Sequence, residues 1–300
     1  MGQCDGRVVI VTGGARGVGR EHSLAFAREG AKVVVNDLGG AADGGGSNAG
    51  VASQLVEEIR AQGGEAIANG ADVADWDATE ELVRTAIETF GGLDVVVNNA
   101  GILRDRMFVN TSIEEWDLII RVHLRGHFCT SRHAAAYWRD RAKAGESVAA
   151  RIVNTSSGAG LQGSVGQSNY AAAKAGIAAL TLNQAAELGR YGITANCIAP
   201  SARTRLTEGV FEDMMKPSEG GFDAMDPANI SPLVVWLGRE ASGDITGRCF
   251  EVEGGKISLA DGWRSGPAAD NGQRWQLTEV GDAVREVIAK SNPPQKVYGT

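Results

Sequence analysis

Three polar side chains in the middle of the sequence have types and spacing suited to proton transfer. Tyr170 and Lys174 are four residues apart in a segment with helical spacing, so they share one helix face. A free tyrosine has a pKa near ~10, too high for efficient proton transfer at neutral pH, and a neighbouring ammonium lowers it. Ser157 follows a predicted strand, where its hydroxyl could hold a reacting oxygen near Tyr170. We therefore expect these three residues to form a catalytic centre.

A glycine-rich turn, Thr12–Arg20, follows the first predicted strand. Its glycines permit a tight turn and let backbone N–H groups approach a pyrophosphate at the N-terminus of the next helix. The spacing of Gly13, Gly17 and Gly19 differs from the usual G-x-G-x-x-G dinucleotide fingerprint. The turn predicts phosphate binding, and a glycine-rich turn without a ligand is the alternative.

Asp37 stands at the end of the second predicted strand, about 20 residues past the glycines. An acid at this place hydrogen-bonds a ribose 2′-hydroxyl and repels a 2′-phosphate, which predicts NAD rather than NADP as cofactor. Arg16 is the opposing signal, because a cation in the turn could bind that phosphate. Asp37 weighs more because it also accepts hydrogen bonds from the ribose. A cationic nicotinamide would lower the pKa of Tyr170 further.

Short apolar runs that alternate with helical patterns must position these residues. Several runs, such as Val8–Val11 and Val95–Val97, are continuously apolar, as in strands buried on both faces. The strand candidates are Arg7–Val11, Lys32–Asn36, Glu65–Ala68, Leu93–Val97, Arg151–Asn154, Ile193–Ile198 and Arg248–Val252. The longest helical patterns are Ile113–Arg141 and Ser168–Leu188, and Pro232–Arg239 is short. The alternation predicts a doubly wound α/β sheet in one domain, residues 1–255, with residues 256–300 as an extension of that domain.

Two segments interrupt this pattern. Gly39–Gly50 is rich in Gly, Ala and Ser, which predicts a flexible loop. Pro200–Pro227 lacks periodicity and follows a strand, which predicts an active-site lid, with a plain surface loop as the alternative. The apolar side chains that such a lid could bring over a substrate are Phe211, Met214, Met215 and Phe222. The tail past residue 255 ends in a helical pattern, Val280–Ile288, that the sequence does not place.

The motifs together resemble the short-chain dehydrogenase/reductase family. The matching pieces are Thr12–Gly19, Asn98-Asn99-Ala100-Gly101, Ser157 and Tyr170-Ala171-Ala172-Ala173-Lys174, and the likeness covers roughly residues 5–255. The resemblance implies a Rossmann domain with a seven-stranded parallel sheet, and hydride transfer between a secondary alcohol and a nicotinamide cofactor. It implies that Asp72 and Val73 flank the adenine and that Lys174 holds the nicotinamide ribose. Further cofactor contacts expected on this basis are Val18, Asn99, Ala100, Gly101, Tyr170, Pro200 and Thr204.

One branch of the family is more similar than the rest. Val35–Gly40, Arg121–Gly126 and the pair Trp236–Leu237 followed by Phe250–Val252 resemble the (3R)-hydroxyacyl-CoA dehydrogenase modules of multifunctional β-oxidation enzymes and related bacterial steroid-degradation dehydrogenases. This branch implies a 3-hydroxyacyl-CoA or steroid-like alcohol as substrate. The arginines that could meet a CoA phosphate are Arg104, Arg106, Arg203 and Arg205, with ordinary solvated surface as the alternative.

His123 departs from the family pattern, in which many members carry an asparagine that holds a proton-relay water. A neutral imidazole is both donor and acceptor and titrates near ~6.5, so His123 could relay the proton itself. A buried histidine bonded to a backbone carbonyl is the alternative. Pro200-Ser201 replaces the Pro-Gly common at the start of the lid. No matching Cys or carboxylate set accompanies His123, His127 and His133, so we expect no metal site.

The composition narrows the classes of partner. A net charge of −8 argues against a nucleic-acid surface, which needs a basic footprint. We see no bilayer-length apolar run and no signal peptide, so we expect a cytoplasmic protein with reduced cysteines. The resemblance implies homodimers or homotetramers built on the two long helices. An NADPH-dependent ketoacyl reductase and a non-enzymatic NAD-binding protein are the rival interpretations, opposed by Asp37 and by the complete Ser-Tyr-Lys set.

Overall fold

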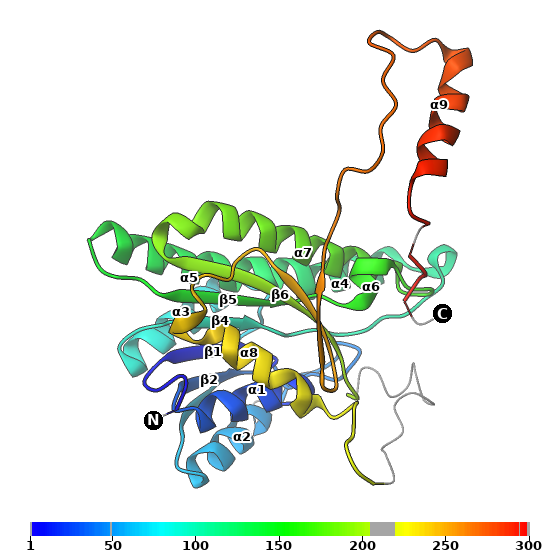
Figure 1. Cartoon of the computed structure of the whole chain (residues 1–300). Coiled ribbons are helices and arrows are strands. Elements are labelled where there is room, and N and C mark those ends of the chain that lie inside the picture. Colours follow the sequence, from blue (N-terminus) through cyan, green and yellow to red (C-terminus); the bar gives the residue numbers. More distant parts are fainter. Residues whose placement is uncertain (1, 49, 205–219, 294, 299–300) are drawn as a thin grey trace.

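An eight-stranded sheet forms the centre of the computed structural model, which describes residues 2–48, 50–204, 220–293 and 295–298 (Figure 1). The strand order is β3-β2-β1-β4-β5-β6-β7-β8. The strands are β1 (Val8–Thr12), β2 (Lys32–Asn36), β3 (Glu65–Asn69), β4 (Val95–Asn98), β5 (Ala150–Thr155), β6 (Ile193–Ser201), β7 (Cys249–Glu253) and β8 (Lys256–Ala260). The predicted doubly wound fold is confirmed.

The expected seven parallel strands are all present, but the sheet has one more. β8 pairs antiparallel with β7, with Glu253 opposite Lys256 across a tight turn at Gly254 and Gly255. Gly254 has a φ of +53°, which favours glycine. The hairpin signal lies in the tail, and the sequence pattern did not assign it to the sheet.

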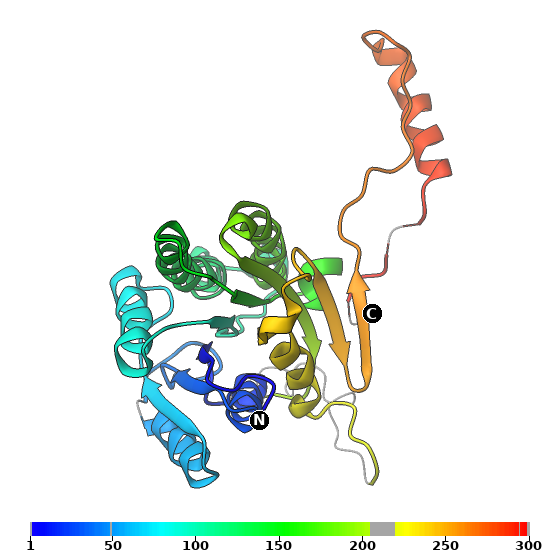
Figure 2. The ribbon, with the colours of Figure 1, turned by 60° about the vertical axis from the view of Figure 1, so that its left-hand side comes forward.

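Helices cover both faces of the sheet (Figure 2). On one face, α1 (Gly17–Arg28), α2 (Gly50–Ala61) and α8 (Ser231–Gly238) pack on Val9, Val11 and Val33. On the other, α3 (Trp76–Phe90), α5 (Gly126–Lys143) and α7 (Ser168–Leu188) cover Val8 and Ile10. Because successive side chains of β1 enter opposite cores, the strand is apolar at every position from Val8 to Val11.

The predicted helix Ile113–Arg141 is interrupted near its middle. α4 (Ile113–Ile120) continues through a π-helical turn, Arg121–Arg125, into α5. A capping box fixes the start of α4, where Ser112 and Glu115 each bond the other's backbone N–H. The π turn is a local change of hydrogen-bond register that the hydrophobic period does not reveal. It contains His123.

Residues beyond β8 leave the sheet and then return to it (Figure 1). α9 (Leu277–Lys290) stands away from the body, and each of its residues is at least partly exposed. The chain end comes back beside α6 (Gly158–Gln162), where the Tyr298 amide donates to the carbonyl of Gly163 at 3.0 Å. The short turns η1 (Phe108–Asn110), η3 (Gly189–Tyr191), η4 (Pro227–Ile230) and η5 (Glu240–Ser242) complete the described elements. In the part of the chain described, we find no helix with the length and apolarity to cross a bilayer.

Candidate active site

The site lies where the strand order reverses, at the carboxyl end of the sheet. β1 pairs with β2 on one side and with β4 on the other, so the connections diverge and leave a crevice between them. A cleft of about 380 Å³ opens there. The predicted site residues that line it are Gly13, Arg16, Gly17, Val18, Asp37, Asp72, Val73, Asn99, Ala100, Gly101, His123, Ser157, Tyr170, Lys174, Pro200 and Thr204. Residues from 13 to 204 thus meet in one place.

Gly19 is the predicted residue that does not line the cleft. A Cβ on Gly19 would stand 2.1 Å from the carbonyl oxygen of Gly13, so α1 packs directly against the turn. Gly13 and Gly17 have φ values of +58° and +52°, which side chains disfavour. The Asn99 amide ties this turn to β4 by donating to the carbonyls of Thr12 and Gly13, each at 3.1 Å. The result is an open cradle of backbone at the start of α1, which fits a pyrophosphate.

Asp37 and Arg16 occupy the adenosine end of the cleft. Asp37 Oδ2 accepts from the Ala15 amide at 3.1 Å and Oδ1 accepts from the Gly39 amide at 2.8 Å. Arg16 donates to the carbonyls of Gly40 at 2.9 Å and Gly39 at 3.4 Å. The Asp37 carboxylate is therefore fixed in place, and the Arg16 guanidinium is engaged by backbone oxygens.

Asp72 and Val73 lie farther along the same wall. Asp72 Oδ1 accepts from the Ala74 amide at 2.9 Å, and Oδ2 pairs with Arg121 at 2.6 Å. Val73 is buried against Gly126, the first residue of α5. The π turn that carries Arg121 is thereby fastened to the loop after β3, a link between sequence-distant residues that no motif predicts.

Ser157, Tyr170 and Lys174 meet at the opposite end of the cleft. Ser157 caps α6 and accepts from the Ala159 amide at 3.2 Å. Lys174 donates from Nζ to the carbonyl of Thr155 at 2.7 Å, and this ammonium is 5.5 Å from the centre of the Tyr170 ring. Tyr170 and Lys174 both lie on α7, whose bounds match the predicted helix.

Burial dominates the electrostatics of this centre in the protein alone. Desolvation lowers the pKa of Lys174 to about 7. Desolvation also raises the pKa of Tyr170 to about 12, and a hydrogen bond with Ser157 opposes that rise. We expected Lys174 to lower the pKa of the phenol, but desolvation raises it, and Lys174 is not among the groups that shift it in the protein alone. The phenol stays protonated there at neutral pH.

His123 is buried and neutral. Its Nε2 lies 2.8 Å from the carbonyl oxygen of Ile102, and its ring meets the Tyr170 ring edge-on at 5.2 Å between centres. Desolvation, with Lys174 nearby, holds the pKa of His123 well below its ordinary value. The expected titration near ~6.5 is wrong, because a charged ring would lose its hydration. Among the described residues, Nδ1 finds no hydrogen-bond partner.

Tyr298 reaches the site from the C-terminal extension, and it was not among the predicted site residues. Its hydroxyl lies 3.0 Å from Ser201 Oγ, and its ring covers Gly158, where an added Cβ would stand 2.4 Å from the ring. It lines the cleft together with Ser157 and Tyr170. An isolated tyrosine outside every motif gives no signal in the sequence.

The predicted lid is described only at its ends. Phe211, Met214, Met215 and Arg205 lie outside the described residues. Phe222 is exposed, and Arg203 pairs with Asp223. Arg104 and Arg106 face Asp43 at 3.6 Å and Glu115 at 3.4 Å. In the described chain, no group of three His, Cys, Asp or Glu side chains could hold a metal ion.

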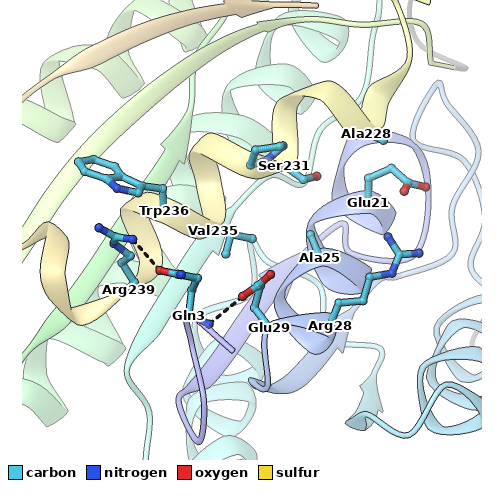
Figure 3. Close-up of a pocket in the computed structure, with 11 residues that line it drawn as sticks. Gln3, Glu21, Ala25, Arg28, Glu29, Ala228, Ser231, Val235, Trp236 and Arg239 are labelled. Carbon is cyan, nitrogen blue, oxygen red and sulfur yellow. Dashed lines mark hydrogen bonds between the residues drawn. The ribbon is translucent and has the colours of Figure 1, made fainter. Parts of the chain in front are cut away.

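A second pocket of about 380 Å³ lies between the N-terminal segment, α1 and α8 (Figure 3). Gln3 bridges its sides, because its backbone N–H donates to the Glu29 carboxylate at 2.7 Å and its side-chain oxygen accepts from Arg239 at 2.6 Å. The Arg239 guanidinium is 5.3 Å from the centre of the Trp236 ring. The residues predicted from the sequence to carry chemistry lie in the other cleft, so we assign this pocket no part in it.

Comparisons with known proteins agree with this geometry. The family model described as short chain dehydrogenase matches residues 7–214. The hydroxyacyl-CoA dehydrogenase ChsB1 of Mycobacterium tuberculosis is 46% identical, over 98% of this chain and 92% of that protein. The peroxisomal multifunctional enzyme type 2 of Mus musculus is 48% identical over 97% of this chain, which spans 35% of that enzyme. A crystal structure of a short chain dehydrogenase from Mycobacterium avium is 62% identical, with a TM-score of 0.91 and full coverage of both chains.

Proposed function

The chain belongs to the short-chain dehydrogenase family, and from this premise we propose that it is an NAD-dependent enzyme that interconverts a 3-hydroxyacyl-CoA and its ketone. Members of this family act on CH–OH groups with NAD or NADP. The observation that carries the proposal is the meeting of Ser157, Tyr170 and Lys174 in the cleft that Gly13, Gly17 and Asp37 also line. The names of the two relatives, a hydroxyacyl-CoA dehydrogenase and a multifunctional peroxisomal enzyme, support the substrate class.

Each residue of the centre has a proposed role in the reaction. The bound nicotinamide supplies the two-electron acceptor or donor for hydride transfer. In alcohol oxidation, the ionised Tyr170 takes the hydroxyl proton as the carbon loses hydride, and in ketone reduction the neutral phenol returns it. Ser157 donates a hydrogen bond to the reacting oxygen and holds it near Tyr170. Lys174, anchored on the Thr155 carbonyl, stabilises the phenolate and holds the nicotinamide ribose.

We infer NAD preference from the adenosine end of the cleft. Asp37 is held by two backbone amides, so its carboxylate stays where a 2′-phosphate would be repelled. Arg16 donates to Gly39 and Gly40, so a 2′-phosphate would have to replace those bonds. The test compares kcat/KM for NAD and NADP on one substrate. A kcat/KM for NADP equal to or above that for NAD would contradict the inference. Asp37→Ala should reduce the ratio of kcat/KM for NAD to that for NADP.

The substrate class needs a direct screen. Hydroxyacyl-CoA thioesters of several chain lengths, steroid-like alcohols, sugars and short polyols are offered with NAD, and reduced cofactor is followed by absorbance. We expect the highest kcat/KM for a 3-hydroxyacyl-CoA. If a steroid alcohol proved the best substrate, the proposed substrate class would be wrong but a bulky apolar alcohol would remain. If a sugar or short polyol proved the best substrate, the substrate proposal would fail altogether.

We propose a positioning role for His123 in place of proton exchange. The neutral ring spans Ile102 and the Tyr170 ring, so it can fix the phenol without titrating. His123→Leu should fold, bind NAD and turn over slowly, with the pH dependence of the wild type. Full activity of a folded His123→Leu enzyme would contradict this role and would show that the His123 side chain only packs in the protein core.

We also propose a homodimer or homotetramer built on α5 and α7. Phe128 on α5 and Leu182 on α7 leave apolar surface exposed, at 45% and 59%. Light scattering after gel filtration measures the assembly, and Leu182→Glu should shift it towards monomer. A wild-type protein that elutes as a monomer at micromolar concentration would refute this.

A further inference from the structure

The segment Gly39–Asn48, called the strap here, is folded into a defined shape. At its base, the Asn48 amide donates to the carbonyl of Leu38 at 3.0 Å and Arg16 donates to Gly39 and Gly40. At its tip, the amide of Ala41 donates to Gly45 at 2.7 Å and that of Gly44 to Ala41 at 3.0 Å. Composition alone predicted a flexible loop, but these bonds close it on itself.

The tip of the strap touches the far side of the cleft. The Leu103 amide donates to the carbonyl of Ala42 at 3.1 Å, and Arg104 faces Asp43 at 3.6 Å. An added Cβ on Gly44 would stand 2.9 Å from Ile102 Cδ1, so the strap's backbone rests on that side chain. Ile102 is buried and packs with Ile119 and Ala173. The contact is therefore made with a fixed wall.

These contacts carry the strap across the cofactor cleft. Its base follows β2, beside Asp37, and its tip meets the segment that follows β4, beside Gly101. Ala41, Ala42 and Gly44 line the cleft with Ile102 and Leu103. A dinucleotide that runs from Asp37 towards Tyr170 would pass beneath the strap.

We propose that the strap closes over the bound dinucleotide and that its opening sets the rate of cofactor exchange. The contacts of Ala42 with Leu103, of Asp43 with Arg104 and of Gly44 with Ile102 hold the strap closed, and we call them the latch. The latch is weak enough to open. One backbone hydrogen bond and one half-exposed ion pair join the strap to the opposite wall, and each contributes little net free energy. The inference needs a nicotinamide cofactor in the cleft, as the family binds, but neither NAD preference nor a particular alcohol.

Two glycines of the strap offer a matched pair of variants. Gly44 and Gly46 have φ values of +89° and +70°, so alanine costs similar backbone strain at both. A Cβ at Gly44 would meet Ile102, whereas one at Gly46 has no atom of the rest of the described protein within 4 Å. Gly44→Ala should therefore break the contact of the strap tip with Ile102 and Leu103, and Gly46→Ala should leave this contact intact.

The rate of NADH release measures the latch directly. The enzyme is loaded with NADH and mixed with excess NAD in a stopped-flow fluorimeter, and NADPH replaces NADH if the protein prefers it. We expect Gly44→Ala to release NADH about 2- to 10-fold faster than wild type, the effect of losing about one backbone hydrogen bond. Gly46→Ala should match wild type. Hydrogen exchange at the Leu103 amide should quicken in Gly44→Ala alone.

Two results would overturn the strap proposal. One is wild-type release from Gly44→Ala together with faster exchange at Leu103, which would show an open strap that does not control the cofactor. The other is equal acceleration of NADH release in both alanine variants, which would assign the effect to backbone strain.

The ion pair between Asp43 and Arg104 is tested by Asp43→Asn, with Arg106→Gln as control, because Arg106 pairs with Glu115 outside the strap. Asp43→Asn should speed release about 2-fold, and no change would remove Arg104 from the latch.

Discussion

At the scale of single residues, the phenol of Tyr170 is the group on which the proposed chemistry depends. Tyr170→Phe removes one oxygen and keeps the ring against His123. We expect turnover to fall ~10²–10⁴-fold, because a general acid–base group contributes about that much, with NAD affinity nearly unchanged. Steady-state kinetics and NAD titration check this. Tyr137→Phe on α5, away from the cleft, is the control, and a Tyr170→Phe enzyme with wild-type turnover would exclude the mechanism.

The pKa of Tyr170 also predicts opposite pH responses for the two directions. Burial keeps the phenol protonated at neutral pH in the cofactor-free protein. Oxidation needs the ionised phenol, so its kcat/KM should rise with pH from 7 to 9, and reduction needs the neutral phenol, so its kcat/KM should not rise. Rates measured in both directions across this range check the prediction. Parallel profiles for the two directions would show that another group controls the proton.

A second residue-scale prediction concerns stability. His22 is fully buried, with Nδ1 2.9 Å from Ser231 Oγ, and desolvation lowers its pKa to about 3. Between pH 6.5 and 3 the unfolded chain binds a proton at His22 that the native state does not, so stability falls as the pH falls. The loss is ~1.4 kcal/mol per pH unit, or about 2 kcal/mol from pH 7 to 5.

His22→Asn keeps a polar group near the Nδ1 position and cannot titrate. Urea unfolding at pH 7 and pH 5 should show that this variant loses about 2 kcal/mol less than wild type over the interval. Desolvation lowers the pKa of His127 to about 3 as well, so the His22→Asn variant should still lose some stability at acid pH through His127. Identical losses for wild type and His22→Asn would mean that His22 is protonated in the native state.

At the scale of elements, the packing of α6 on α7 sets the catalytic geometry. Gly160 on α6 approaches α7 so closely that an added Cβ would stand 2.6 Å from Lys174 Cβ and 2.8 Å from the Ala175 amide nitrogen. Gly160→Ala must push the helices apart, which separates Ser157 from Tyr170 and Lys174. Misplacement by ~1 Å can cost ~10²-fold in rate, whereas overpacking costs about 1–3 kcal/mol of stability.

We therefore expect Gly160→Ala to reduce kcat about 10- to 100-fold in a protein that still melts cooperatively. Gly189→Ala, just past the end of α7, meets no atom within 4 Å of its added Cβ among the described residues and serves as control. Kinetics and thermal melting of both variants measure the effect. A fully active Gly160→Ala enzyme would show that the two helices adjust without disturbing the centre.

The elements also show what the sequence could and could not predict. β1, β2, β4 and α7 were predictable because buried strands are continuously apolar and α7 has a regular period, whereas β8 was not predicted. The π turn at Arg121–Arg125 was not, because it alters hydrogen-bond register while the helix continues. The folded shape of the strap and the contact of Tyr298 with Ser201 were not predictable either, because both depend on partners distant in sequence. Motif residues assembled as expected, but their pKa values depend on burial that only the fold reveals.

At the scale of the whole molecule, Tyr298 in the C-terminal extension lines the same cleft as residues that follow the first strands. Tyr298 follows β8 and α9, yet its ring covers Gly158 and its hydroxyl meets Ser201. Its partners Gly158 and Ser201 lie at the ends of β5 and β6, whereas Asp37 follows β2 on the other side of β1 and β4, so we expect Tyr298 to contact the substrate and not the adenosine. Tyr298→Ala opens this end, and Tyr298→Phe keeps the ring and removes only the hydroxyl.

We expect Tyr298→Ala to lower kcat/KM for the best thioester substrate about 2- to 10-fold, which corresponds to the loss of an aromatic contact worth ~0.5–1.5 kcal/mol. Tyr298→Phe should retain most of the activity, because the ring supplies the wall. The KM for NAD should stay unchanged in both variants, since Asp37 and the glycine turn are untouched. Kinetics at saturating NAD, then at saturating substrate, separate the two effects. A rise in the KM for NAD with unchanged substrate kinetics would place the tail on the cofactor side of the cleft, and unchanged kinetics throughout would make Tyr298 a structural anchor for the returning chain.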